Sequence, residues 1–148
     1  MAKREFKFKD INITGTRVKI EVDMSRFEKQ FQKAQFYLDS QVMTDMVPYM
    51  PSRTHAFINL VRARSAALAG SGVVVAGVPP SGRFLYRGKV MIDPVTGSPW
   101  ARPGAKKVVT NRPLTYSNPQ ATPHWFDTAK ERHGKQWVEE TKRIAGGG

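Results

Sequence analysis

The order of secondary-structure signals along this chain predicts an α+β fold, in which two main helices pack on a small antiparallel sheet and a long β-hairpin or loop forms an arm. Two segments with helical apolar periodicity lie near residues 26–47 and 123–144, and the region between them holds short apolar runs separated by Gly and Pro. With 148 residues, 40% of them hydrophobic, the chain can build one core. We therefore expect an N-terminal arm over residues 1–15 and a single domain over residues 16–145.

The first third of the chain predicts a strand followed by a long helix. Residues 1–15 are polar and favour a loose arm or an edge strand, whereas residues 16–23 alternate apolar and charged side chains, which indicates a half-buried strand. Ser25 and Glu28 have the spacing of a capping box, so a helix is expected to begin there. Its apolar residues recur every three or four positions until two prolines end it. This stripe consists of Phe27, Phe31, Ala34, Leu38, Val42 and Met46.

The middle of the chain predicts strands and an elaborate loop. Residues 55–68 give mixed helix and strand signals, whereas the valine run at residues 73–76 indicates a short buried strand. Residues 84–92 are expected to form a strand interrupted by Gly88, and residues 106–110 and 114–116 can return as strands. Residues 84–116 together are therefore expected to form an extended hairpin. Its tip, a projecting loop at about residues 93–105, holds too many Gly and Pro residues for a regular element.

The final helix has the clearest boundaries. Thr122 is an acceptable N-cap residue, and Pro123 suits the first helical position because no amide proton is needed there. Lys142 and Arg143 favour the negative end of the helix, and three glycines follow it. The side chains expected to anchor the core between the helices are Phe27, Phe31, Leu38, Phe126, Trp125 and Trp137.

Positive charge is concentrated in the middle of the chain. Residues 46–126 hold ten Arg or Lys residues and one acid, Asp93, while the segments on either side are close to balanced. The net charge of +12 therefore divides into +2, +9 and +1 along the chain. A surface with so few acids suggests a negatively charged partner or an interface. Composition leaves both nucleic acid and an acidic protein surface open.

The residue types that enzymes use are not arranged for catalysis. The chain has no cysteine, and His55, His124 and His133 lack the spacing of a metal site. A glycine-rich stretch at residues 82–90 departs from a phosphate loop, because five residues separate its glycines and Val replaces the hydroxyl residue. No paired carboxylates, and no nucleophile with its base, are recognisable. We expect no enzymatic activity, cofactor, metal or small-molecule substrate, and no segment reaches the roughly 20 apolar residues of a membrane span.

Two groups of residues are candidates for binding. Trp100 lies beside Arg102 in a Pro/Gly loop without a local core, which is typical of an interface hot spot. The expected subunit-interface arm comprises Asp93, Pro94, Thr96, Trp100, Arg102, Lys106 and Lys107. Arg83, Arg87 and Lys89 alternate on one face of the expected strand and could follow DNA phosphates or meet an acidic partner, although a solvated strand face explains them as well. Together with Arg112, they form the second group.

Four blocks carry a family pattern. They are Asp45-Met-Val-Pro-Tyr-Met-Pro-Ser-Arg-Thr-His, Phe84-Leu-Tyr-Arg-Gly-Lys-Val-Met-Ile-Asp-Pro-Val-Thr-Gly, Leu114-Thr-Tyr-Ser and His124-Trp-Phe-Asp-Thr-Ala-Lys followed by Trp137. Together they resemble the minor capsid or head–tail joining proteins of long-tailed bacteriophages, over about residues 18–144. The most specific parts are Tyr-Arg-Gly-Lys and Trp-Phe-x-x-Ala-Lys. In one departure, the family's Pro-x-x-Thr-Gly-x-Leu is replaced by a sequence in which His55 follows Thr54.

The resemblance implies an α+β neck or tail-completion subunit that assembles into a ring, sixfold or twelvefold, between the portal connector and the tail tube. Its implied partners are itself, the neighbouring neck, connector and tail-tube proteins, and the packaged DNA that passes through the lumen. Its implied location is the head–tail junction of the virion, after assembly in the bacterial cytoplasm, with no role at a membrane. The competing hypothesis is a small basic nucleic-acid-binding protein without sequence specificity.

Overall fold

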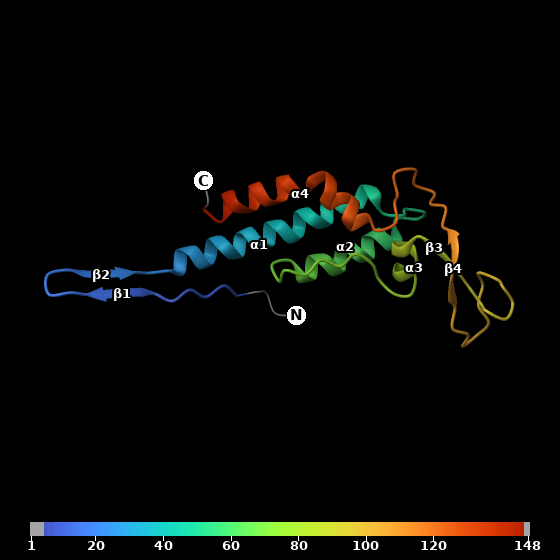
Figure 1. Cartoon of the computed structure of the whole chain (residues 1–148), viewed down its shortest axis with the longest axis horizontal. Coiled ribbons are helices and arrows are strands. Elements are labelled where there is room, and N and C mark those ends of the chain that lie inside the picture. The colour runs from blue at the N-terminus through green and yellow to red at the C-terminus, as the bar shows by residue number, and fades with distance from the viewer. Residues whose placement is uncertain (1–4, 147–148) are drawn as a thin grey trace.

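The computed structural model describes residues 5–146 as an elongated α+β molecule (Figure 1). Its elements, in chain order, are β1 (Ile11–Thr14), β2 (Lys19–Val22), α1 (Ser25–Met46), the 3₁₀ turn η1 (Val47–Tyr49), α2 (Ala56–Leu68), α3 (Gly82–Arg87), β3 (Lys89–Ile92), β4 (Val108–Pro113) and α4 (Trp125–Ile144). The predicted α+β class is confirmed, with four α-helices and two small antiparallel sheets in the described part of the chain. Residues 1–4 of the expected arm and the last two glycines lie outside the described residues.

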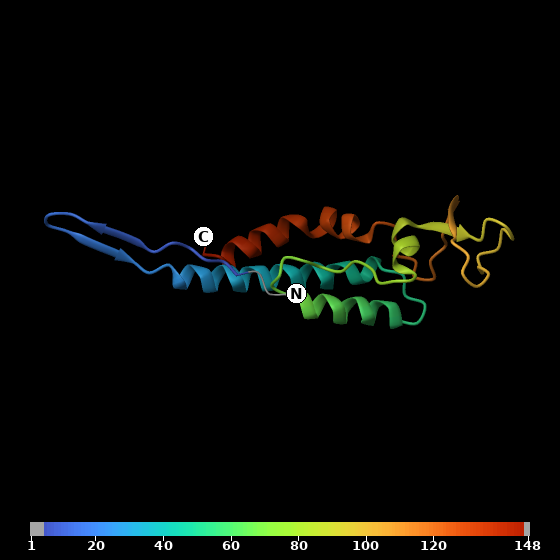
Figure 2. The ribbon, with the colours of Figure 1, turned by 90° about the horizontal axis from the view of Figure 1, so that it is seen from below.

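The two longest helices, α1 and α4, lie side by side and run in opposite directions (Figures 1 and 2). Their facing apolar stripes form the hydrophobic core together with α2. Burial of these side chains away from water is the main source of the stability of the fold. Trp125 is fully buried and Trp137 nearly so, while Leu38 and Phe126 pack at the border of the core. A polar contact also joins the helices, because Trp137 Nε1 donates to Asp45 Oδ2 over 2.6 Å.

Helix α1 begins within one residue of its expected start, but without the expected capping box. Ser25 Oγ donates to Asp23 Oδ2 over 3.0 Å, and the Glu28 carboxylate accepts from the Phe8 amide over 2.7 Å. Both side chains of the predicted box therefore bind the segment before the helix rather than the helix terminus. This arrangement attaches the N-terminal segment to the first turn of α1.

The first turns of α1 extend past the end of α4. Gly146, which follows α4, lies beside Gln30. Phe27 and Phe31 are consequently 44% and 36% exposed, so the expectation that they anchor the core is wrong. Phe31 instead contacts the ring of Phe8, with 5.2 Å between the ring centroids.

Strands β1 and β2 form a two-stranded antiparallel ribbon that projects from the N-terminal end of α1 (Figure 2). A turn closed by the 2.8 Å hydrogen bond from Gly15 N to Val18 O joins them. The expected strand is present, but its expected half-burial is wrong, because every residue from Ile11 to Glu21 is exposed. The ribbon lies clear of the helices, so neither of its faces reaches the core.

The segment after α2 follows the helices without forming a strand. Residues 73–76 are extended but pair with no strand, so the expected buried strand is wrong. Ser65 Oγ in α2 takes the place of a neighbouring strand, because it donates to Val75 O over 3.1 Å and accepts from Val75 N over 3.0 Å. The buried Asp39 carboxylate in α1 accepts from the Gly70 amide over 2.8 Å. These bonds hold the segment against α1 and α2.

Residues 84–92, expected as one strand interrupted by Gly88, instead form most of a helix and then a strand. Gly82–Arg87 form α3, and Gly88 ends it with a φ of +67°, a conformation that glycine adopts readily. Strand β3 then pairs antiparallel with β4, so the predicted hairpin exists but its paired part begins at Lys89. Residues 114–116, expected as a strand, follow β4 without a ladder of their own.

Helix α4 begins at Trp125, two residues later than expected. His124 precedes it with a φ of +50°, and Thr122 does not cap the helix. The Thr122 hydroxyl instead forms a 2.9 Å hydrogen bond with the hydroxyl of Thr128. The residues before α4 therefore form a turn that packs on the helix rather than its first helical turn.

Candidate interaction site

One end of the molecule is formed by α3, β3, β4 and the connection between the two strands, and it lies opposite the β1–β2 ribbon (Figure 1). Within this connection, residues 93–105 are named the Trp100 loop. They contain no regular element, as the sequence predicted. The loop nevertheless has a defined internal structure.

The Trp100 loop is built around the buried carboxylate of Asp93. Asp93 Oδ2 accepts from Arg102 Nε over 2.8 Å and from Arg102 N over 3.2 Å. Asp93 Oδ1 accepts from Val95 N over 2.9 Å and from Arg102 Nη2 over 3.3 Å. The backbone closes the same turn, because Asp93 N donates to Ser98 O and Gly97 N donates to Asp93 O, each over 2.8 Å. Both ends of the loop are thereby joined.

The Asp93 side chain is held in its ionised form. Hydrogen bonds from the Arg102 guanidinium and then from the Val95 amide keep the pKa of the Asp93 carboxyl well below its usual range. A carboxylate suits this position because its two oxygens can accept several bonds at once. Asp93 and Arg102, both expected in the subunit-interface arm, are thus brought together, but Asp93 is fully buried and acts as internal support.

Trp100 is presented to solvent by this support. Its side chain is 87% exposed, and its backbone amide donates to Ser98 Oγ over 3.1 Å. Val95, on the same loop, is 72% exposed, and Pro94 and Thr96 are exposed beside it. An indole held on an ordered loop loses little conformational freedom on binding, which favours its use as an interface anchor.

A small cavity of about 240 Å³ lies behind Trp100, between the loop and the β3–β4 hairpin. Phe84, Met91 and Leu114 contribute to its lining. Lys107, expected in the interface arm, lines it too, with Nζ 5.9 Å from the centre of the Phe84 ring. Lys107 therefore packs partly against its own chain.

Six cations near the loop have no acid to balance them. Residues 82–118 hold seven basic side chains and one acid, a net charge of +6, and the Asp93–Arg102 pair is neutral. The other six are Arg83, Arg87, Lys89, Lys106, Lys107 and Arg112. The expectation that the first three share one strand face is wrong, because two lie on α3 and one on β3. The two arginines are four residues apart and still share a helix face.

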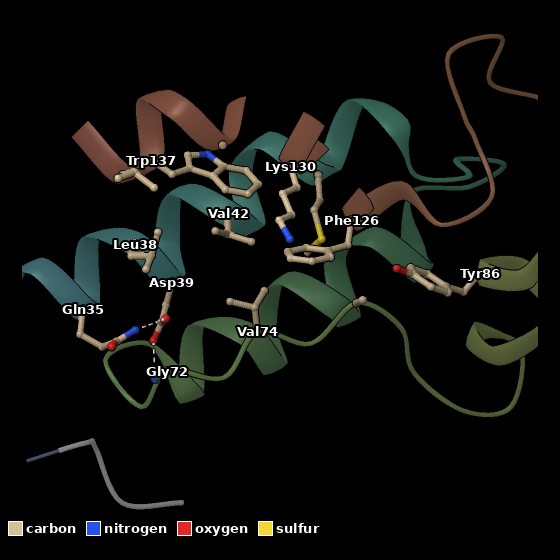
Figure 3. A pocket seen from close by; sticks show the side chains of 14 residues that line it. Gln35, Leu38, Asp39, Val42, Gly72, Val74, Tyr86, Phe126, Lys130 and Trp137 are labelled. Atoms are coloured by element: carbon tan, nitrogen blue, oxygen red, sulfur yellow. Dashed lines mark hydrogen bonds between the residues drawn. The ribbon is translucent and has the colours of Figure 1, made fainter. Parts of the chain in front are cut away.

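An open groove of about 500 Å³ lies between α1, residues 72–76 and α4 (Figure 3). Its apolar lining includes Leu38, Val42, Val74, Phe126 and Trp137. Asp39, at one edge, already accepts from Gly72 N over 2.9 Å and from Gln35 Nε2 over 2.8 Å. Sequence reasoning missed this groove, because its walls come from three segments that no local pattern connects.

The described residues contain no cluster of three or more His, Asp or Glu side chains that could hold a metal ion. The histidines lie apart and have local contacts: His55 Nδ1 is 3.0 Å from Ser52 Oγ, and His133 stacks on Trp137. His124 contacts the edge of the Tyr86 ring, with 5.0 Å between the ring centroids. Across residues 5–146, no helix is long and apolar enough to cross a membrane.

No protein-family model, curated protein or solved structure matches this chain.

Proposed function

We propose that this chain is a structural protein of the bacteriophage virion, a minor capsid, neck or tail-completion subunit that forms a ring between the portal connector and the tail tube. The observation that carries the proposal is the exposure of Trp100 on a loop that is ordered by Asp93. Because the Trp100 side chain is 87% exposed in this chain, its burial against a neighbour would be favourable. The proposed role is structural and requires no catalysis, cofactor or membrane.

The surface around Trp100 supports a protein partner at this end. Val108 and Val109 are 45% and 46% exposed beside the loop, and Val95 is more exposed still. Apolar side chains gain little from contact with phosphate groups, whereas an acidic protein surface with an apolar pocket would match both valines and cations. We assign the contact of the Trp100 loop to the neighbouring subunit or to the adjoining ring.

Some of the cations are proposed to face the packaged DNA in the lumen. Arg83 and Arg87 are exposed on α3 and carry no ion pair among the described residues. They belong to the group for which the sequence left DNA and an acidic partner open. Contacts of this kind are independent of DNA sequence, as passage of a whole genome requires.

Self-assembly of the purified chain tests the proposal. Native mass spectrometry and electron microscopy at increasing protein concentration are expected to show a ring, sixfold or twelvefold. Trp100→Ala should weaken the ring, whereas the control Gln136→Ala, at an exposed position of α4 away from the Trp100 loop, should leave it intact. A chain that stays monomeric under assembly conditions would contradict the proposal.

The six unbalanced cations also favour the second candidate, a nucleic-acid-binding protein without sequence specificity. Neutralisation of about six phosphates predicts a slope of about −5 for log affinity against log salt concentration. Binding of the isolated monomer to duplex DNA with that slope would support this second candidate. Binding that is weak for the monomer but present for the ring would support the neck subunit.

A further inference from the structure

The β1–β2 ribbon has one apolar and one polar face. Its register pairs Ile11 with Val22 and Ile13 with Ile20, so these side chains lie on one face, and Val18 lies on the same face nearer the turn. The other face carries Asn12, Thr14, Lys19 and Glu21. The four apolar side chains nearest the turn are between 45% and 61% exposed. An isolated two-stranded ribbon is only marginally stable in water, so burial of this apolar face against another surface would stabilise it.

Contacts at its base fix the direction of the ribbon. Met24 N donates to Asp10 Oδ1 over 2.9 Å, and Phe8 N donates to Glu28 Oε1 over 2.7 Å, so both strands are attached to the start of α1. From there the ribbon extends away from α2 and α4, as both views show (Figures 1 and 2). The α1–α4 groove lies along the body of the molecule (Figure 3). A chain therefore does not cover its own groove with its own ribbon.

The groove matches the apolar face of the ribbon in chemical character. Its lining contains two charged residues, Asp39 and Lys130, and the Asp39 carboxylate is already bound within the chain. A nucleic acid or an acidic peptide would meet a single cation there. The β-branched side chains of the ribbon would meet apolar walls instead.

Charge favours a second copy of this chain as the source of the ribbon. The whole chain carries +12, so two copies can associate only through a contact that limits repulsion. Residues 5–24, which include the ribbon, hold four basic and four acidic side chains and have no net charge. Each copy also offers one uncovered ribbon and one uncovered groove, at different places on its surface. Head-to-tail contact would cover both in every subunit.

We propose that the apolar face of the β1–β2 ribbon docks into the α1–α4 groove of a second copy of this chain. The contact is heterologous, and its repetition forms a ring where the rotation between subunits closes. The inference deepens the proposed function, and rests on it, by naming the next subunit of the ring as the partner of the ribbon. It adds an assembly contact on a different surface from the Trp100 loop.

Sedimentation velocity of the full chain and its variants tests the docking. The double variant Ile13→Asp with Ile20→Asp charges the apolar face, and the matched control Asn12→Asp with Thr14→Asp adds the same charge to the polar face. Gly134→Phe fills the groove from α4, where a Cβ meets only the Lys130 side chain at 3.6 Å, and Gly134→Ala is its control. Replacing a helical glycine favours the helix, and an unchanged thermal unfolding temperature would show that loss of assembly does not reflect unfolding.

The ribbon variant and the Gly134→Phe variant are each expected to raise the concentration for half-association at least about tenfold, while both controls behave as the wild type. A mixture of the two assembly-deficient variants retains one intact ribbon and one intact groove, so it should form dimers that neither variant forms alone. Assembly of both variants at wild-type concentrations, or a mixture without dimers, would overturn the docking. If rings persist in these variants but disappear in Trp100→Ala, the docking is wrong and the proposed function stands. A monomeric wild type would overturn both.

Discussion

Asp93 and Arg102 form the ion pair that closes the Trp100 loop, with Asp93 Oδ2 and Arg102 Nε 2.8 Å apart. The Asp93 side chain is fully buried and that of Arg102 is 53% exposed, so the pair connects the inside of the hairpin to its surface. The loop is therefore ordered when the chain folds rather than when it binds. Binding of a partner therefore does not have to order the loop that carries Trp100, which lowers the entropic cost of binding.

Acidification is expected to loosen this loop. The pKa of Asp93 is lowered in the folded state, so its contribution to stability is present above the unfolded pKa, about 3.9, and is lost as the pH falls toward the folded value. Hydrogen exchange of the Val95 and Arg102 amides should therefore accelerate below about pH 4, after correction for intrinsic exchange rates. Asp93→Asn should exchange faster at neutral pH and lack this pH dependence. The same acid response in Asp93→Asn would show that another group is responsible.

Trp100→Ala is expected to separate assembly from stability. Because the indole is 87% exposed, its removal should leave the thermal unfolding temperature of the monomer unchanged. Association should weaken by about 2 kcal/mol, roughly 30-fold in the dissociation constant, as at interface hot spots. Calorimetry of the monomer and concentration-dependent light scattering measure the two effects. A clear fall in unfolding temperature would instead give Trp100 a role in the fold.

Two glycines with similar φ angles should respond differently to alanine. Gly88 has a φ of +67°, and a Cβ there would lie 2.6 Å from Pro123 Cβ, whereas Gly97 has a φ of +70° with nothing within 4 Å. Gly97→Ala should cost about 1 kcal/mol from backbone strain alone. Gly88→Ala should cost about 3 kcal/mol or more, because overpacking adds to that strain. Urea unfolding compares them, and equal losses would show that the contact with Pro123 relaxes freely.

The bond between Trp137 and Asp45 is expected to stabilise the α1–α4 pair. Trp137→Phe removes the indole donor and should lower the free energy of unfolding by about 1–3 kcal/mol. Asp45→Asn keeps an oxygen that can accept from Trp137 Nε1, so its effect should be smaller. Equilibrium unfolding in urea measures both changes. A larger loss in Asp45→Asn would assign the stabilisation to the charge of the carboxylate.

The long helices could be predicted because their apolar stripes extend over many turns, but α3 could not. Its six residues are too few to distinguish a helical period from alternation, and Arg83 and Arg87 fit both. The useful signal was Gly88, a residue suited to the left-handed position after a helix. The predictions of the helix caps were wrong for a related reason. The Glu28 side chain bonds to Phe8, 20 residues away, and the Thr122 side chain bonds to Thr128 within α4, so neither is available to cap its helix.

Burial was the least predictable property of the candidate sites. Alternation placed Val18 and Ile20 on one face of a strand, but exposure depends on whether a neighbour reaches that face, and none of residues 5–146 covers it. Asp93 was expected in the interface arm but is buried, because four hydrogen bonds, three of them from Arg102, make its burial favourable. Trp100 was placed correctly in an exposed loop, because the prolines and glycines around it allow no local core.

The length of α1 has a consequence for any layered particle. Its 22 residues span about 33 Å at the usual helical rise, and it is braced by α4 along most of that length. The helix pair is therefore a spacer that fixes the distance between the plane of the ribbon and the plane of the Trp100 loop. Insertion or deletion of one helical turn would move these two planes by about 5.4 Å without altering either contact surface. The length of the helix pair would thus set the axial spacing between layers of the assembly, whereas the contact surfaces would set their affinity.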